Sequence, residues 1–264
     1  MEKQVKEELP SDHIYQDIRK IKHIKVIIPH FQTGNHMTNR EATGIDKLDE
    51  ILDGGLPEGA SIMVIGKPGT GKSLFCSQFL KEGMDSEQGG LYITLDNSPE
   101  DIIDGAKEFG WTFKESDKFI IMDVYSWKLG KEITSDYAVQ GPSDLNQLNM
   151  TLSDALKDIG DCDKRIVMDS ASSLTFFTDT SSTVRFLQVV SAKTKANNGV
   201  LVMTVEEGVH DEQTLSTLNY TADGVIRFKK EDDQRYFSVS RMAKTQVNED
   251  WHEFRINDNG IETF

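Results

Sequence analysis

The chain has 264 residues, of which 37% are hydrophobic and 28% charged; this is enough apolar material for a packed domain and excludes a disordered chain. The formal net charge of −15 disfavours a nucleic-acid partner, because phosphate backbones would be repelled. No apolar run is long enough to span a bilayer, and the charged start Met1–Glu8 is unlike a secretory signal, so we expect a cytoplasmic protein without membrane contact.

Residues 1–40 differ in character from the rest of the chain. Isoleucines recur near helical spacing at Ile14, Ile18 and Ile21, which predicts a short amphipathic helix. The run Lys25–Ile28 predicts a brief strand that Pro29 stops. We therefore expect an N-terminal extension over residues 1–40, which could make an oligomer contact, and a main domain over residues 41–264.

From Thr43 onward, predicted strands and helices alternate. A capped helix is expected over Thr43–Leu52, with Gly54 and Gly55 ending it. Further strands are expected at 61–65, 90–95, 118–124, 165–169 and 200–205, and further helices from 74, from 98, and near 145–159 and 183–196. This alternation predicts an α/β fold, a mostly parallel twisted sheet flanked by helices. The closely spaced strands at 224–229, 236–242 and 251–256 lack intervening helices, so we expect an antiparallel C-terminal extension of the sheet.

The most specific motif is an eight-residue run between the strand at 61–65 and the helix after it, Gly66-Lys67-Pro68-Gly69-Thr70-Gly71-Lys72-Ser73. It matches the pattern G-x-x-x-x-G-K-[ST] of loops that wrap nucleotide phosphates. Glycines let backbone amides approach the phosphates, and the start of a helix adds partial positive charge. We expect Lys72 to reach the β and γ phosphates as a catalytic residue, Ser73 to bind Mg²⁺, and Leu74 to complete the nucleotide-binding segment.

A second part of the site is expected where the apolar strand at 165–169 ends in an acid. In proteins with this phosphate loop, such an aspartate holds the water shell of Mg²⁺ beside the loop serine. Asp169 is therefore the expected second metal and catalytic residue, although strands that end in an Asp-Ser turn are common for other reasons.

Taken together, these motifs resemble those of a single ATPase domain of the KaiC-like group in the RecA/RadA superfamily, of the archaeal type. The similarity spans residues 43–264 and implies a RecA-like core. It further implies ATP and Mg²⁺ held at the subunit boundaries of a homo-oligomeric ring or short filament, for which a hexamer is one option. The matching segments are Thr43–Asp49, Gly54–Pro57, the phosphate loop, Tyr92–Ile103, Ile166–Ser170, Ala222–Ile226 and Phe254–Ile261.

One departure from the KaiC-like pattern concerns the group that activates water. The resembling proteins carry paired glutamates before Ser/Thr-Pro, whereas this chain has Asp96 and Asn97 before Ser98-Pro99. Asn97 cannot accept a proton, and Asp96 is one methylene shorter than glutamate. General-base assistance contributes roughly 10²–10⁴-fold to rate, so we expect slow hydrolysis with Asp96 as the remaining catalytic carboxylate. Alternatively, Asp96 and Asn97 cap the helix that starts at Ser98.

A second departure lies in the tail. The KaiC-like group has Lys-x-Arg-Gly-[Ser/Thr]-x-His, whose basic residues reach the neighbouring subunit's γ-phosphate, and this chain has instead the segment Arg241–Val247. Arg241 and Thr245 could still serve, and Lys244 could replace part of the missing arginine, although a point charge lacks the bidentate fork. The Arg and His positions are Ala243 and Val247 here. Asp258 matches a downstream aspartate of the group and is either a boundary contact or a turn residue.

Three classes of function remain open. The first is a nucleotide-dependent oligomeric signalling component with weak ATPase activity at most. The second is a RadA-like recombination ATPase, which the acidic segment Glu206–Glu212 disfavours because DNA phosphates would have to pass there. The third is an autophosphorylating Ser/Thr kinase, for which Ser170, Ser172, Ser173 and Thr178 are available, although these residues are typical of loops and helix caps.

Overall fold

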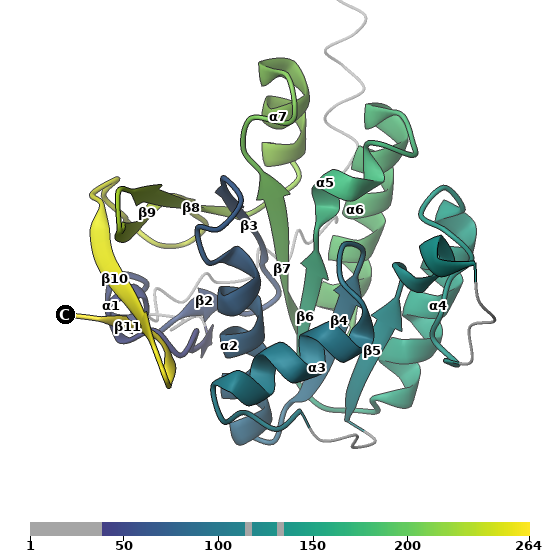
Figure 1. Ribbon diagram of the computed structural model, residues 1–264, viewed down its shortest axis with the longest axis horizontal. Coiled ribbons are helices and arrows are strands. Elements are labelled where there is room, and N and C mark those ends of the chain that lie inside the picture. Colours follow the sequence, from purple (N-terminus) through teal and green to yellow (C-terminus); the bar gives the residue numbers. More distant parts are fainter. Residues whose placement is uncertain (1–38, 114–117, 131–134) are drawn as a thin grey trace, which may run out of the picture. The chain divides into compact units, whose positions relative to one another are not determined.

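The computed structural model describes residues 39–113, 118–130 and 135–264 (Figure 1). The helix and strand expected before residue 38 lie outside the described residues, so the domain division at residue 40 stays a prediction. Residues from Thr38 onward form one compact unit by their contacts. No helix in the described ranges is long and apolar enough to cross a bilayer.

A mixed sheet of nine strands organises the described part of the chain. Six neighbouring strands are parallel, and three C-terminal strands continue the sheet in antiparallel fashion, which confirms the predicted fold class. In spatial order the strands are β11 (Gly260–Thr263), β10 (His252–Asn257), β9 (Gln234–Met242), β8 (Gly224–Glu231), β3 (Ser61–Gly66), β7 (Gly199–Glu206), β6 (Lys164–Asp169), β4 (Gly89–Thr94) and β5 (Phe119–Asp123). One detail differs from expectation: β8 pairs in parallel with β3, so the antiparallel part begins at β9.

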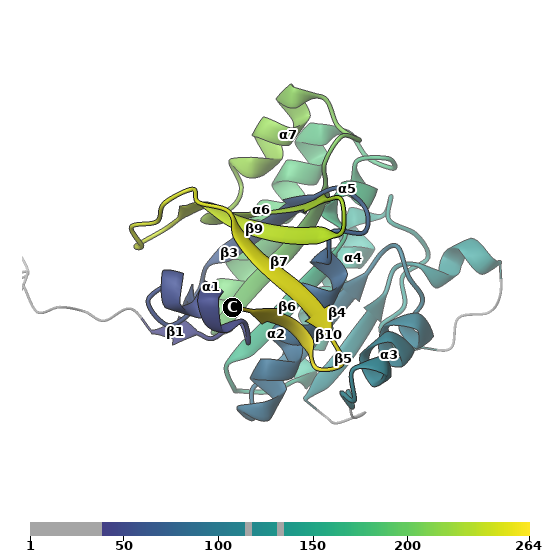
Figure 2. The ribbon, with the colours of Figure 1, turned by 60° about the vertical axis from the view of Figure 1, so that its left-hand side comes forward.

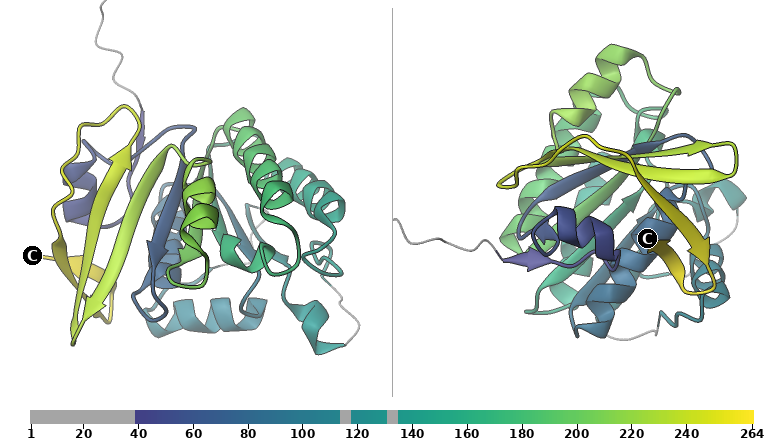
Figure 3. Two further views of the ribbon diagram at one scale, coloured as in Figure 1. Left: turned by 90° about the horizontal axis from the view of Figure 1, so that it is seen from above. Right: turned by 90° about the vertical axis from the view of Figure 1, so that its left-hand side faces the viewer.

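Helices cover both faces of the sheet (Figures 1 and 3). One face carries α2 (Lys72–Asp85) and α3 (Pro99–Glu108), and the other carries α4 (Leu145–Asp158), α5 (Ala171–Leu174), α6 (Thr180–Ala196) and α7 (Glu212–Asn219). The first described segments are β1 (Arg40–Glu41), α1 (Asp46–Ile51) and β2 (Leu56–Pro57), and a 3-10 helix, η2, spans Ser126–Leu129. The helices α5 and α7 were not predicted, because each is too short to show a helical period over several turns.

The central strands are apolar throughout because both of their faces are buried. In β3, Ile62 and Val64 enter the core under α2, whereas Met63 and Ile65 enter the core under α6. Successive side chains of a strand point to opposite faces of the sheet. Because helices cover both faces, every position of the strand is buried and the sequence is hydrophobic throughout. Because these strands are parallel, their carboxyl ends lie at one edge of the sheet, where the phosphate loop begins.

The C-terminal strands curl so that β11 lies against α1 and α2 (Figure 2). Gln78 of α2 holds β11 in this position through side-chain hydrogen bonds. Its side-chain amide donates to the carbonyls of Gly44 (2.6 Å) and Ile261 (3.1 Å), and its side-chain oxygen accepts from the Ile261 amide at 2.7 Å. The turn between β10 and β11 is thereby held beside the helix that starts at the phosphate loop.

Candidate nucleotide-binding site

The phosphate loop connects β3 to α2 through backbone shapes that suit glycine. Gly69 and Gly71 have φ values of 76° and 107°, in the left-handed region. A Cβ on Gly66 would come within 2.5 Å of the Phe228 carbonyl oxygen, so a side chain does not fit there. The hydroxyl of Thr70 closes the loop by donating to the Lys67 carbonyl at 2.9 Å. The run predicted from sequence thus forms an open turn of main-chain atoms.

The first turn of α2 has no side-chain cap, unlike four other helices of the chain. Gly71 precedes it and makes no side-chain cap hydrogen bond. By contrast, Ser98, Asp144, Asp179 and Asp211 each accept a hydrogen bond from an amide in the first turn of α3, α4, α6 and α7. Uncapped helix amides and the helix dipole attract anions, so the start of α2 is ready to receive a phosphate group.

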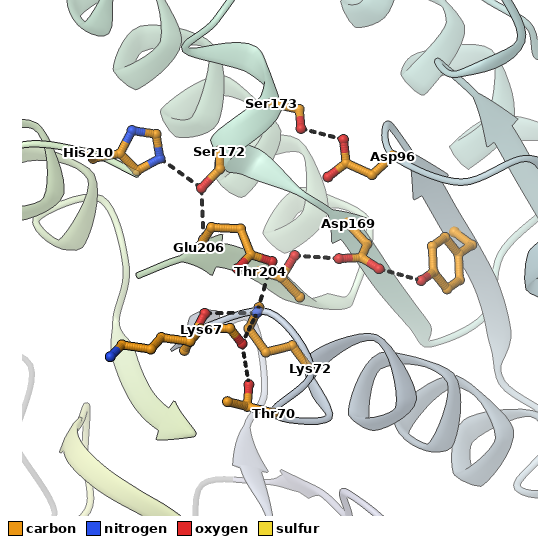
Figure 4. Close-up of polar contacts among 12 residues, drawn as sticks. Lys67, Thr70, Lys72, Asp96, Asp169, Ser172, Ser173, Thr204, Glu206 and His210 are labelled. Carbon is orange, nitrogen blue, oxygen red and sulfur yellow. Dashed lines mark hydrogen bonds and ion pairs between the residues drawn. The ribbon is translucent and has the colours of Figure 1, made fainter. Parts of the chain in front are cut away.

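Lys72 is buried, with 5% of its surface exposed, and its ammonium is fully engaged (Figure 4). It donates to the carbonyls of Gly66 (2.8 Å) and Lys67 (3.1 Å) and pairs with the Glu206 carboxylate at 2.9 Å. Glu206 is the last residue of β7 and lies opposite Gly66 in the strand register. Its second carboxylate oxygen is buried without a hydrogen-bond partner in the described part of the chain. The ammonium is therefore neutralised by a carboxylate at the place where a phosphate would bind.

Asp169 ends β6 on the same sheet edge and is also buried. Its carboxylate accepts hydrogen bonds from the Tyr92 hydroxyl at 2.9 Å and from the Thr204 hydroxyl. Burial, and then the charge of Asp169, raise the pKa of Tyr92 well above its usual range, so the phenol stays a donor. Each carboxylate oxygen keeps a further lone pair. Asp169 is thereby oriented by two strands and can still accept from the water shell of a metal ion.

Oxygen donors for Mg²⁺ are present in this arrangement. Ser73 is exposed at the start of α2, and its hydroxyl has no partner within the described ranges. A serine hydroxyl and a carboxylate, with water and phosphate completing the shell, suit Mg²⁺, which prefers oxygen and keeps several waters. No cluster of three or more His, Cys, Asp or Glu side chains that could hold a metal occurs among the described residues.

Asp96 and Asn97 do not cap α3, and that alternative is wrong. The cap is Ser98, which forms a reciprocal capping box with Asp101. Asp96 is exposed, and its carboxylate accepts a hydrogen bond from the Ser173 hydroxyl of α5 at 2.5 Å. It lies at the carboxyl edge of the sheet, two residues beyond the point where β4 pairs with Asp169. The structure therefore brings the expected carboxylate to the edge that carries Lys72 and Asp169.

The buried serines of α5 were read as loop or cap residues in the sequence, and this reading is also wrong. Ser172 accepts from the Glu206 amide at 2.8 Å and lies 2.8 Å from Nε2 of His210. Burial lowers the pKa of His210, with Asp211 opposing the shift, which favours the neutral imidazole in its hydrogen bond with the serine hydroxyl. The contact of Ser172 with Glu206 and His210 was not predicted, because residues far apart in the sequence meet there only in the folded chain. The one signal in the sequence was Glu206, an acidic residue at the end of the buried strand that follows the strand ending in Asp169.

The residues expected to act on a neighbouring subunit do not approach their own phosphate loop. Met242 pairs with Gly224 at the start of β8, so the segment after it lies at the amino edge of the parallel strands. The Arg241 guanidinium donates to the carbonyls of Asn219 and Ala222, both at 2.8 Å. Lys244 is exposed with φ of 58°, at the position where the pattern quoted above has glycine. Thr245 accepts from Arg40 at 2.7 Å.

Asp258 lies in the tight turn between β10 and β11 and is exposed there. The turn is closed by Asn257, whose side-chain oxygen accepts from the Asn259 amide at 2.8 Å, and by Gly260 with φ of 113°. The geometry accounts for Asp258 as a turn residue, and a boundary contact stays a prediction.

Two clefts flank the phosphate loop. One of about 220 Å³ is lined by Ser73, Leu74, Tyr92 and Asn97, between α2 and α3. The other, of about 470 Å³, lies between the loop and the C-terminal strands. Its lining includes Lys67, Arg227, Lys229, Lys230 and Trp251. A larger groove of about 810 Å³ between α4 and α6 does not include residues of the phosphate loop. The two clefts beside the loop, and not the groove between α4 and α6, therefore offer space next to the expected phosphate position.

A glycine-rich loop between a central parallel strand and a helix, with an acid at the end of a neighbouring strand, defines a phosphate-loop nucleotide-binding protein of the RecA-like fold. Comparison with known families assigns it further. The family described as "ATPase: KaiC" matches residues 41–264, so the chain belongs to the KaiC ATPase family.

Curated relatives and a solved structure agree with this assignment. A "UPF0273 protein" of Pyrococcus horikoshii is 30% identical over 235 residues, covering 85% of this chain and 94% of the relative. One of Methanopyrus kandleri is 28% identical over 232 residues, covering 84% and 90%. The crystal structure of a KaiC-like protein from Pyrococcus horikoshii superposes with a TM-score of 0.70 at 22% identity, covering 86% of this chain and 99% of that one, which supports the fold alone.

Proposed function

We propose that the protein binds ATP with Mg²⁺ in this cradle and acts as a nucleotide-dependent oligomeric regulator. The observation that carries the proposal is the buried Lys72, which points into an open turn of main-chain atoms beside an uncapped helix start. A buried ammonium in such a turn is a site for a polyphosphate. Ser73 and Asp169 would hold Mg²⁺, which neutralises charge on the phosphates when it is bound.

Hydrolysis is expected to be slow. Asp96 is the carboxylate best placed to orient a water molecule, but it is exposed and already accepts from Ser173. Asn97 has no proton-accepting group. The tail also lacks the arginine expected at position 243 and the histidine expected at 247. A trans-acting arginine contributes about 10³–10⁵-fold to phosphoryl transfer, so its absence favours a long-lived ATP state.

The places of the phosphate loop and of the tail segment support the proposed oligomer. The phosphate loop is at the carboxyl edge of the parallel strands, and the segment Arg241–Thr245 is at the amino edge. A segment at one edge can serve only the site of another copy. ATP would then join two subunits, and a ligand well above its dissociation constant stabilises the joined state by a few kcal/mol.

Mass photometry with and without MgATP, together with a phosphate-release assay on the same sample, tests this function. We expect larger species in MgATP and phosphate release well below one per second. Association that does not depend on nucleotide would contradict the regulatory role. Release faster than about one per second would contradict slow hydrolysis, since typical enzymes turn over near 10 s⁻¹.

A further inference from the structure

Arg40 joins the first described strand to the turn that follows β9. Its Nη1 donates to the Thr245 hydroxyl at 2.7 Å, and its Nη2 donates to the Lys244 carbonyl at 3.0 Å. A longer contact of 3.5 Å links Nη1 to the Gly55 carbonyl. The two short bonds use both terminal nitrogens of the guanidinium, which only arginine can offer in this planar fork.

The turn at Ala243–Thr245, to which Arg40 is hydrogen-bonded, has an unfavourable backbone conformation. Lys244 has φ of 58°, a left-handed conformation that is strained for a residue other than glycine. The residue before it is fixed as well, because the Ala243 amide donates to the Asp223 carbonyl at 3.0 Å. Such a conformation persists only where its surroundings hold it, and the Arg40 bond to the Lys244 carbonyl is part of that support.

The effect of this turn is to present a cation. Lys244 is exposed, and its ammonium makes no hydrogen bond or ion pair with any residue of the described ranges. It lies near the level of Gly224 on β8, whereas the phosphate loop starts at the level of Phe228. Four residues of strand separate these levels by roughly 13 Å, so the backbone of Lys244 lies far from its own phosphate loop.

We propose that Arg40 is a positioning residue that holds the Ala243–Thr245 turn so that Lys244 faces the phosphate site of a second copy of this chain. The inference rests on the proposed function, because it requires ATP at a boundary between subunits. Arg40 is not one of the phosphate-loop residues. It acts on the neighbouring site through the backbone and hydroxyl that it binds.

The test compares Arg40→Ala with Lys72→Ala in titration calorimetry and mass photometry. Arg40→Ala keeps its own phosphate loop, so it should bind MgATP within about twofold of wild type while its MgATP-dependent association weakens at least tenfold. Arg40→Lys should behave like Arg40→Ala, because one ammonium cannot reach both acceptors. Arg185→Ala, which changes an exposed arginine on α6, should associate like wild type.

Mixing the two defective variants tests whether the turn of one subunit acts on the phosphate site of another. With Lys72→Ala carried on a fusion tag of distinct mass, each mixed pair has one boundary that joins the intact loop of Arg40→Ala to the intact turn of Lys72→Ala. Mixed dimers should therefore form in MgATP more readily than dimers of either variant alone. An absence of mixed dimers, or loss of MgATP binding in Arg40→Ala, overturns the inference. Wild-type protein that binds MgATP without associating instead contradicts the oligomeric function on which the inference depends.

Discussion

At the residue scale, the main observation is that Lys72 is shared between two carbonyls and the Glu206 carboxylate. A triphosphate must compete with that carboxylate for the ammonium, and it also brings negative charge close to the buried, unpartnered oxygen of Glu206. Because like charges repel strongly where water is scarce, Glu206 should weaken nucleotide binding.

The variant Glu206→Gln should therefore bind MgATP about tenfold more tightly than wild type, because it keeps the shape of the side chain and removes the repelling charge. The larger gain is expected for ATP over ADP, since the carboxylate lies where the terminal phosphate interacts with Lys72. Titration calorimetry with both nucleotides measures this. Glu207→Gln, one residue further along, is the control, and equal affinities of wild type and Glu206→Gln would contradict the competition.

Lys244 allows a second test at this scale, because its backbone conformation should lower stability whereas its charge should favour association. Glycine adopts φ of 58° without strain, and asparagine tolerates it better than lysine. Lys244→Gly and Lys244→Asn should keep or raise the melting temperature while MgATP-dependent association falls at least fivefold. Gln246→Gly, at an exposed neighbouring position, should leave association unchanged. A loss of thermal stability in both Lys244 variants would mean that the side chain has a structural role.

At the scale of elements, the one-turn helix α5 links three parts of the site. Ser173 binds Asp96 beyond β4, while Ser172 binds the end of β7 and His210 beyond it. The helix begins two residues after Asp169, so a shift of Asp169 would be passed to Asp96 and Glu206 through one short element. His210 also stacks on Phe176, which follows α5 and is exposed.

This contact predicts a pH dependence with a definite sign. Burial lowers the pKa of His210 in the folded state, while the charge of Asp211 opposes the shift. The unfolded chain therefore binds the proton more readily, with a pKa of about 6.5. The contribution of His210 to stability is present above that pH and is lost as the pH falls from it through the lower pKa of the folded state.

His210→Gln keeps an acceptor for Ser172 but cannot be protonated. Urea unfolding at pH 7.5 and 5.5 should show a smaller loss of unfolding free energy for the variant than for wild type. The other histidines and Asp211 are common to both proteins, so the difference reports His210. Identical losses in the two proteins would contradict the predicted neutral state.

Some elements could be predicted because their signals are continuous in sequence. The phosphate loop is a single run, and the strand that ends in Asp169 is a plain apolar segment. By contrast, Glu206 meets Lys72 only because β7 pairs with β3 so that Glu206 lies opposite Gly66. The short elements α5, α7 and β11 have too few residues for a period to emerge. The register between β7 and β3 cannot be read from the sequence, and this register brings Glu206 and Lys72 together as an ion pair.

At the scale of the whole domain, the described chain carries two complementary edges. The carboxyl edge of the parallel strands holds Lys72, Asp169 and Asp96, and the amino edge holds Arg241, Lys244 and Thr245. Under the proposed function neither edge completes a site alone, so nucleotide would act on how copies join. All of these expectations depend on whether the cradle around Lys72 binds a polyphosphate.

Titration calorimetry of MgATP into wild-type protein and Lys72→Ala tests that dependence most directly. Lys81→Ala is the matched control, because Lys81 lies on the same helix, is partly exposed and pairs with Asp85 far from the loop. We predict saturable binding for wild type and Lys81→Ala, and affinity at least tenfold weaker for Lys72→Ala. Equal affinities for wild type and Lys72→Ala would contradict the account.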